Sequence, residues 1–174
     1  MAIISTPSIA QITKQLDAHS HGEAQISIAI DGDQIFLTLV SPAANLVGFE
    51  HSPKNAEQRE HADTTQHTLS DYTNLYELPA DTNCEVAEKS VQWTFDRDSN
   101  NEKHTEHADT PSGHSEFEAE FLLTCENSAG INTIGVRLFE QFPAIERIRV
   151  EVLFDSSQIV EVLTPAKNTV KLAR

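Results

Sequence analysis

The sequence predicts a single α+β domain: a mostly antiparallel sheet of six or seven strands, one main helix, and a long hairpin loop rich in histidine and acidic residues. Several runs alternate between apolar and polar residues, which is typical of half-buried strands. Most of these runs are joined by short turns, and one longer polar segment carries helix signals. The chain's 174 residues suffice for one domain with a substantial core. We assign the domain to residues 19–174, an N-terminal tail to 1–18 and a flexible loop to 96–115.

The clearest strands form a hairpin near the start of the chain. Apolar residues occupy every second position from Ala24 to Ile30 and again from Ile35 to Leu39. Gly32, between two aspartates, marks a tight turn because glycine tolerates positive φ. Further strands are expected at 91–95, 117–125, 134–138, 148–154 and 159–163, with a last short strand at 170–172.

The main helix is predicted over about 53–71. Ser52 is a good N-cap residue, and Pro53 fits the first helical position. The apolar stripe of this segment is thin, so we expect the helix to lie on the surface. Shorter helical turns are expected within 43–51 and 137–143.

The loop predicted at 96–115 carries three of the eight histidines of the chain, His104, His107 and His114, among several acidic residues. Imidazole and carboxylate together suit Zn²⁺ better than Ca²⁺ or Mg²⁺, which prefer oxygen ligands alone. This composition is compatible with a metal-binding loop and also with a solvated polar loop whose histidines bind no ligand.

A second histidine pattern precedes the first strand. His19 and His21 are two residues apart, so in an extended segment both imidazoles project to the same face. Glu50 and His51 follow the first short helical segment.

The two cysteines, Cys84 and Cys125, stand at comparable ends of the predicted hairpin. This placement favours one disulfide and an oxidising compartment. Two free thiols in a reducing compartment are the alternative. In a strict register, a Cys84–Cys125 pair would place Val91 and Trp93 on the opposite face from Phe117. A β-bulge between Cys84 and Val91 would resolve this conflict, or the cysteines pair from outside the ladder.

Composition excludes several classes of function. A formal charge of −15 argues against nucleic-acid binding and against anionic membrane surfaces. No apolar run is long enough for a transmembrane helix, and the first residues lack the features of a signal peptide, so an exported form would need a leader that this sequence does not show. Motifs for serine hydrolases, P-loop enzymes, dinucleotide binding and zincins are missing, so we predict a protein that is not an enzyme.

Several strings give the chain a specific resemblance: HSHGEA at 19–24, SPAANLVGFEHSP at 41–53, the FxAxFxxxC run at 117–125 and RLFEQFPAIERIRVEVL at 137–153. They resemble the ZrgA family of bacterial periplasmic zinc-binding proteins, from His19 to Pro165. The resemblance implies an exported protein found beside zinc uptake systems, with a variable His/Asp/Glu-rich loop that segment 96–114 fills here. This segment is shorter and poorer in histidine than the richest examples.

The resemblance also maps motifs onto this chain. The opening HxHG of the family falls on His19, His21 and Gly22, and its GFEH falls on residues 48–51. Its H-x-D-F-x-A falls on the segment from His114 to Ala119, where Glu118 stands in place of a histidine seen in some relatives. The candidate zinc ligands are His19, His21, His51, His104, His107, His114 and Glu116.

Together these observations predict a periplasmic zinc-binding protein that buffers zinc or delivers it to a zinc uptake transporter, with a component of a zinc ABC transporter as the possible partner. The alternative is an extracytoplasmic module that binds a protein or a glycan and whose histidines are incidental. A metal-dependent hydrolase is the least favoured hypothesis. Because an extended HxH is held rigidly, we expect the tighter site to use His19 and His21, completed by His114 or His51, and His104 and His107 to bind more weakly.

Overall fold

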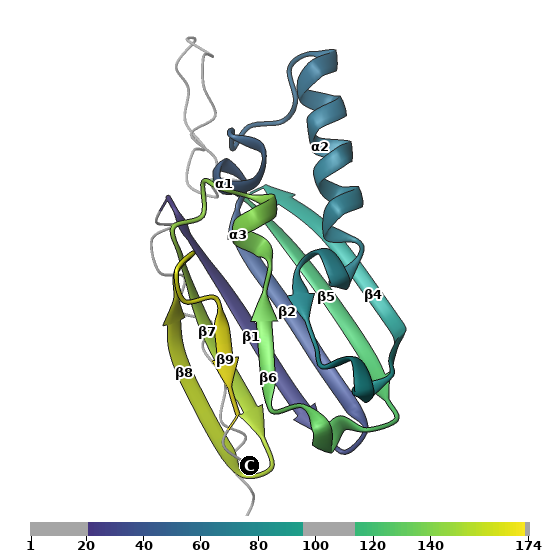
Figure 1. The fold of residues 1–174 in the computed structure, drawn as a ribbon. Coiled ribbons are helices and arrows are strands. Elements are labelled where there is room, and N and C mark those ends of the chain that lie inside the picture. The colour runs from purple at the N-terminus through teal and green to yellow at the C-terminus, as the bar shows by residue number, and fades with distance from the viewer. Residues whose placement is uncertain (1–20, 96–113, 173–174) are drawn as a thin grey trace, which may run out of the picture.

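The computed structural model describes residues 21–95 and 114–172, and its main element is a six-stranded sheet (Figure 1). The strand order is β4-β5-β2-β1-β7-β8. Neighbouring strands are antiparallel except β1 and β7, which run parallel. The strands are β1 (Glu23–Asp31), β2 (Gln34–Pro42), β4 (Cys84–Phe95), β5 (Ser115–Cys125), β7 (Arg147–Phe154) and β8 (Ser157–Leu163). The predicted α+β class with a mostly antiparallel sheet is confirmed.

A second layer covers one face of this sheet (Figure 1). It contains the three-stranded sheet β3-β6-β9 and the helices. Its elements are β3 (Tyr76–Glu77), β6 (Thr133–Val136), β9 (Thr169–Lys171), α1 (Ala43–Val47), α2 (Ala56–Leu69) and α3 (Leu138–Gln141). In the part of the chain that the structure describes, no helix is long and apolar enough to cross a membrane.

The core lies between the two layers and follows the alternation of the strands. Ile28 pairs with Leu37 on β2 and with Val152 on β7, and Leu37 pairs with Phe121 on β5. All four side chains are almost fully buried. Burying each such side chain contributes about 1.5–3 kcal/mol relative to exposure. The alternate residues of the same strands therefore form the other face of the sheet, which no described helix or strand covers (Figure 1). We call this the uncovered face.

The hairpin β4–β5 carries the predicted disulfide. Cys84 and Cys125 are paired in register and joined by a bond of 2.03 Å. The register shifts between Val86 and Glu88, so one extra residue is accommodated on β4. This β-bulge resolves the predicted conflict, because beyond it Trp93 faces Phe117.

The main helix begins later than predicted. Helix α2 starts at Ala56, and Asn55 is its N-cap: the Asn55 side chain accepts a hydrogen bond from the Gln58 N–H at 2.9 Å. The Gln58 side chain in turn accepts one from the Lys54 N–H at 2.8 Å. This reciprocal arrangement resembles a capping box and satisfies two backbone donors. The helix start predicted from Ser52 and Pro53 is therefore three residues too early.

The short helix α1 leads directly to the GFEH segment. Gly48 ends α1 with φ of 81° and donates its N–H to the Ala44 carbonyl at 3.1 Å. A left-handed residue at a helix C-terminus is usually glycine, because a Cβ is strained there. This turn redirects the chain and sets the position of the residues from Phe49 to His51.

Candidate metal centre

The predicted ligands divide into two groups. His19, His104 and His107 lie outside the described residues, as do the tail 1–18 and all of the predicted loop except His114 and Ser115. His21, His51, His114 and Glu116 lie within them.

Glu50 brings two of the predicted ligands together. Its Oε1 lies 3.5 Å from His21 Nε2, and its Oε2 lies 3.0 Å from His114 Nδ1. The Glu50 side chain is only 18% exposed, whereas His21 and His114 are 72% and 58% exposed. A mostly buried carboxylate therefore holds two solvent-accessible imidazoles, which come from positions 93 residues apart in the chain.

The His21 end of this cluster is fixed by backbone contacts. Gly22 has φ of 82°, and its N–H donates to Asn45 Oδ1 at 2.8 Å. The buried Asn45 side chain also donates from Nδ2 to the Glu23 carbonyl at 2.8 Å. Asn45 thus ties the start of β1 to α1, and α1 leads to Glu50. The positive φ explains why glycine follows the HxH pattern.

Aromatic contacts hold the Glu50 segment against strands β4 and β5. The Phe49 ring lies 6.1 Å from the ring of Trp93 on β4, and Trp93 stacks on Phe117 of β5 at 4.7 Å. Aromatic contacts of this kind contribute about 0.5–1.5 kcal/mol beyond the area they bury. They attach the loop that carries Glu50 to the end of the hairpin that carries His114.

The other two described candidates are His51 and Glu116. His51 stacks on Phe49 at 5.1 Å, and its Nδ1 lies 2.9 Å from the Ser52 carbonyl. If Nδ1 is the protonated nitrogen, Nε2 keeps a lone pair for a ligand. Glu116 belongs to β5, where it alternates with the buried Ser115 and Phe117 and therefore projects to the uncovered face.

The distances around Glu50 suit a zinc ion. Zinc bonds of about 2.0–2.1 Å place neighbouring ligand atoms about 3.3 Å apart around a tetrahedron. The two N···O separations, 3.5 and 3.0 Å, lie on either side of this value. Glu50 Oε1 is also buried and, within the described residues, has no hydrogen-bond partner. A cation would satisfy this acceptor.

These contacts do not by themselves make a complete site. Within residues 21–95 and 114–172, no three His, Cys, Asp or Glu side chains converge closely enough to hold a metal ion. Glu50 meets the two imidazoles through different oxygens. The residues fit zinc by donor type and by the separation of each pair, and a complete site needs a further ligand or a rotation of a side chain.

Glu50 was not in the predicted ligand set. Periodicity could not identify it, because it lies in a loop between two helices. The only signal was its place in the GFEH string, which linked it to the family without giving it a role.

An α+β domain with imidazoles and a carboxylate gathered at one end of its sheet, and with both of its cysteines in a disulfide, carries the donor types of a zinc-binding protein without thiolate ligands. The comparison with protein families identifies one family within this class. The family model described as ZrgA family zinc uptake protein matches residues 18–172. The chain therefore belongs to the ZrgA family, as the sequence motifs indicated. The search of curated proteins found no match.

Proposed function

We propose that this protein binds Zn²⁺ in the periplasm, without catalysing a reaction, and buffers the ion or delivers it to a zinc uptake transporter. Membership of a family of zinc uptake proteins supports a role in uptake. The observation that carries the proposal is the position of Glu50 between His21 and His114. The Cys84–Cys125 disulfide supports an oxidising compartment.

The proposed zinc ligands come from three different segments. His21 precedes β1, Glu50 follows α1, and His114 precedes β5. A zinc ion held by these side chains would cross-link all three segments at one end of the sheet. His19, two residues before His21, is the candidate for a further ligand. The charge of the ion would also compensate the mostly buried carboxylate of Glu50.

The donor set suits an ion that must be released again. Both cysteines of the chain are joined to each other, so the oxidised protein offers no thiolate. Imidazole and carboxylate hold zinc less tightly than cysteine sulfur. Two of the proposed ligands are also more than half exposed, so a competing ligand from a transporter component can reach the ion.

The test is calorimetric zinc titration of chelator-stripped protein, with metal analysis to fix the stoichiometry. The variant is Glu50→Gln, which keeps the size of the side chain and removes its charge. Hydrogen bonds and contacts to charged groups contribute about 1.5–3 kcal/mol, so we expect zinc affinity to fall by about 10- to 100-fold. Glu140→Gln is the matched control, because Glu140 is an exposed residue of α3.

Unchanged zinc affinity in Glu50→Gln would refute the assignment of the site. A wild-type protein that is stable and shows no zinc binding would refute the proposed function. That second result would favour the alternative proposal, an extracytoplasmic module that binds a protein or a glycan.

A further inference from the structure

Among residues 21–95 and 114–172, most of the exposed large apolar side chains lie on the uncovered face of the six-stranded sheet. The helices and the three-stranded sheet all lie on the opposite side (Figure 1). Six large apolar side chains are exposed among the described residues, and four of them alternate with core residues and so lie on this uncovered face: Phe36, Leu153, Val160 and Val162. Their exposed fractions are 44%, 47%, 44% and 53%. Grouped apolar side chains on a soluble domain mark an interaction surface. We refer to this surface as the open face.

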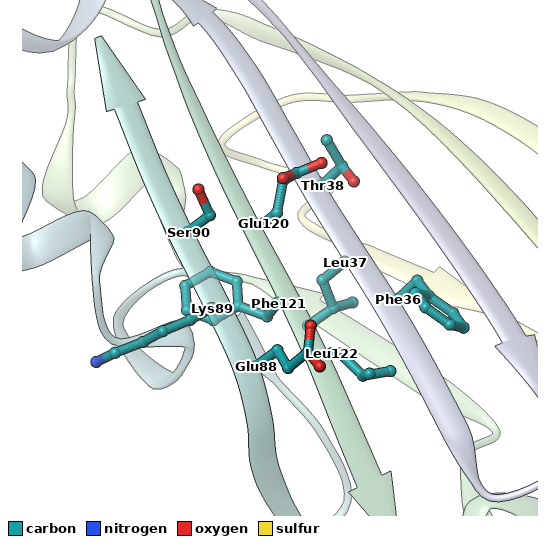
Figure 2. Close-up of a pocket in the computed structure, with 9 residues that line it drawn as sticks. All are labelled: Phe36, Leu37, Thr38, Glu88, Lys89, Ser90, Glu120, Phe121 and Leu122. Carbon is teal, nitrogen blue, oxygen red and sulfur yellow. The ribbon is translucent and has the colours of Figure 1, made fainter.

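Strand register arranges the open face in rows that run across the strands. One row crosses the four central strands and is entirely apolar. It consists of Leu122 on β5, Phe36 on β2, Ala29 on β1 and Leu153 on β7. Figure 2 shows one end of this row, where Phe36 and Leu122 line a shallow pocket beside Glu88 and Glu120.

Charges of opposite sign flank the centre of the open face. Glu116, Glu118 and Glu120 alternate along β5, whereas Arg147 and Arg149 alternate along β7. The midline of the sheet runs between β2 and β1, so β5 and β7 lie at equal distances from it. Glu118 and Arg149 belong to the same row, which also contains Val40 and Gln25.

This arrangement is self-complementary. We propose that a second copy of this chain docks face to face on the open face, about a two-fold axis that runs parallel to the strands between β1 and β2. The rotation places Glu118 opposite Arg149 of the second copy, and Leu122 opposite Leu153. Each of these contacts occurs twice, as an isologous interface requires. The aligned packing of two sheets, at about 30°, keeps the central rows close to register.

The size of the open face agrees with a dimer. Six strands spaced about 4.8 Å apart, and four rows about 6.7 Å apart, span roughly 29 by 27 Å when half a spacing is added at each border. That is roughly 800 Å² for each copy, the usual contribution of one partner to a specific interface.

One row opposes association. Rotation places Glu120 opposite Glu151 of the second copy, and like charges in contact are unfavourable. Glu151 already accepts a hydrogen bond from the Gln158 amide at 2.6 Å, which occupies part of its carboxylate. Because this row is repulsive, we expect a reversible dimer at the weak end of the range for interfaces of this size, with a dissociation constant on the order of micromolar. This proposal does not depend on zinc binding.

Analytical ultracentrifugation of the full chain over a wide concentration range tests the proposal. A chelator is present throughout, so that an association bridged by zinc does not count. We expect a monomer–dimer equilibrium for the wild type. Arg149→Glu and Glu118→Arg each replace two attractive pairs by two repulsive ones, so each variant alone should dimerise at least about tenfold more weakly.

An equimolar mixture of the two variants provides the decisive measurement. Both cross-copy pairs become attractive again in a dimer of one Arg149→Glu chain and one Glu118→Arg chain, so dimerisation should return. The matched controls are Arg59→Glu and Glu60→Arg on α2, which lies on the other side of the sheet, and both should dimerise like the wild type. A wild type that stays monomeric, or a mixture that fails to dimerise although both variants are folded, overturns the proposal.

Discussion

The Cys84–Cys125 disulfide gives a stability prediction that can be worked out from the topology. The two cysteines are 41 residues apart, and the segment between them includes β4 and the connection to β5. In the chain-entropy model, closing a loop of this length in the unfolded state stabilises the folded state by about 4 kcal/mol. For a chain of this size that loss corresponds to a fall in Tm of roughly 10 °C. The perturbation is Cys84→Ala with Cys125→Ala, or reduction of the wild type.

We expect the fold to persist without the disulfide. Strand β4 pairs with β5 on both sides of the bulge, and Trp93 stacks on Phe117, and neither contact needs the disulfide. The assay is urea unfolding followed by the fluorescence of Trp93, the one tryptophan of the chain, with a chelator present because reduced thiols bind zinc. Reduced wild type separates the effect of the cross-link from that of losing two sulfur atoms. A destabilisation below about 1 kcal/mol in both proteins would refute the reasoning from loop entropy.

The remaining predictions concern the pH dependence of zinc binding, the histidines that bind the ion, and the buried Tyr76. Zinc affinity should fall between about pH 7.5 and 5.5, roughly tenfold for each ligating histidine, because an imidazole binds zinc only when neutral and its ordinary pKa is near 6.5; a flat profile in calorimetry would show that carboxylates dominate. His19→Ala with His21→Ala should remove the tight phase of a zinc titration, whereas deletion of 99–110 should lower the stoichiometry and keep that phase, because ordering a loop costs about 1–2 kcal/mol per residue; the reverse result would make the loop the principal site. Tyr76→Phe should stabilise the protein by about 1 kcal/mol in urea unfolding, because the Tyr76 hydroxyl is buried and has no hydrogen-bond partner among the described residues. Burial raises the pKa of Tyr76 above its usual value of 10.0, so wild-type stability should decline above about pH 10, where only the unfolded state ionises, and Tyr76→Phe should decline less.

Much of the fold was predictable because alternation of apolar residues depends only on local sequence. The hairpin of β1 and β2 and the strands β5 and β7 followed from side-chain parity, which also left the bulge in β4 as one of two alternatives. The parallel pairing of β1 with β7 did not, because about 115 residues separate these strands in the chain and no local pattern specifies which distant strands become neighbours. The start of α2 was misplaced because two N-cap signals, at Ser52 and at Asn55, lie close together.

The site was less predictable than the fold for the same reason. His21 and His114 were recognisable as candidates from their residue type and context, but their proximity depends on the order β5-β2-β1, which places the starts of β5 and β1 at the same end of the sheet. Glu50 reaches both only because Gly48 turns the chain after α1 and Phe49 packs on Trp93. None of these conditions can be read from the number of residues that separate the ligands in the sequence.

The position of the site relative to the loop suggests how the two groups of histidines could cooperate. Residues 96–113 connect Phe95 to His114, so the segment that carries His104 and His107 begins and ends beside the Glu50 cluster. Tethering raises the effective concentration of a ligand near its points of attachment, to about millimolar for short linkers. We therefore expect weak, rapidly reversible zinc binding by His104 and His107 to raise the rate at which zinc reaches His21, Glu50 and His114, without adding to the equilibrium affinity of those three residues. Deletion of 99–110 should then slow zinc association in a stopped-flow measurement, and an unchanged association rate would contradict this expectation.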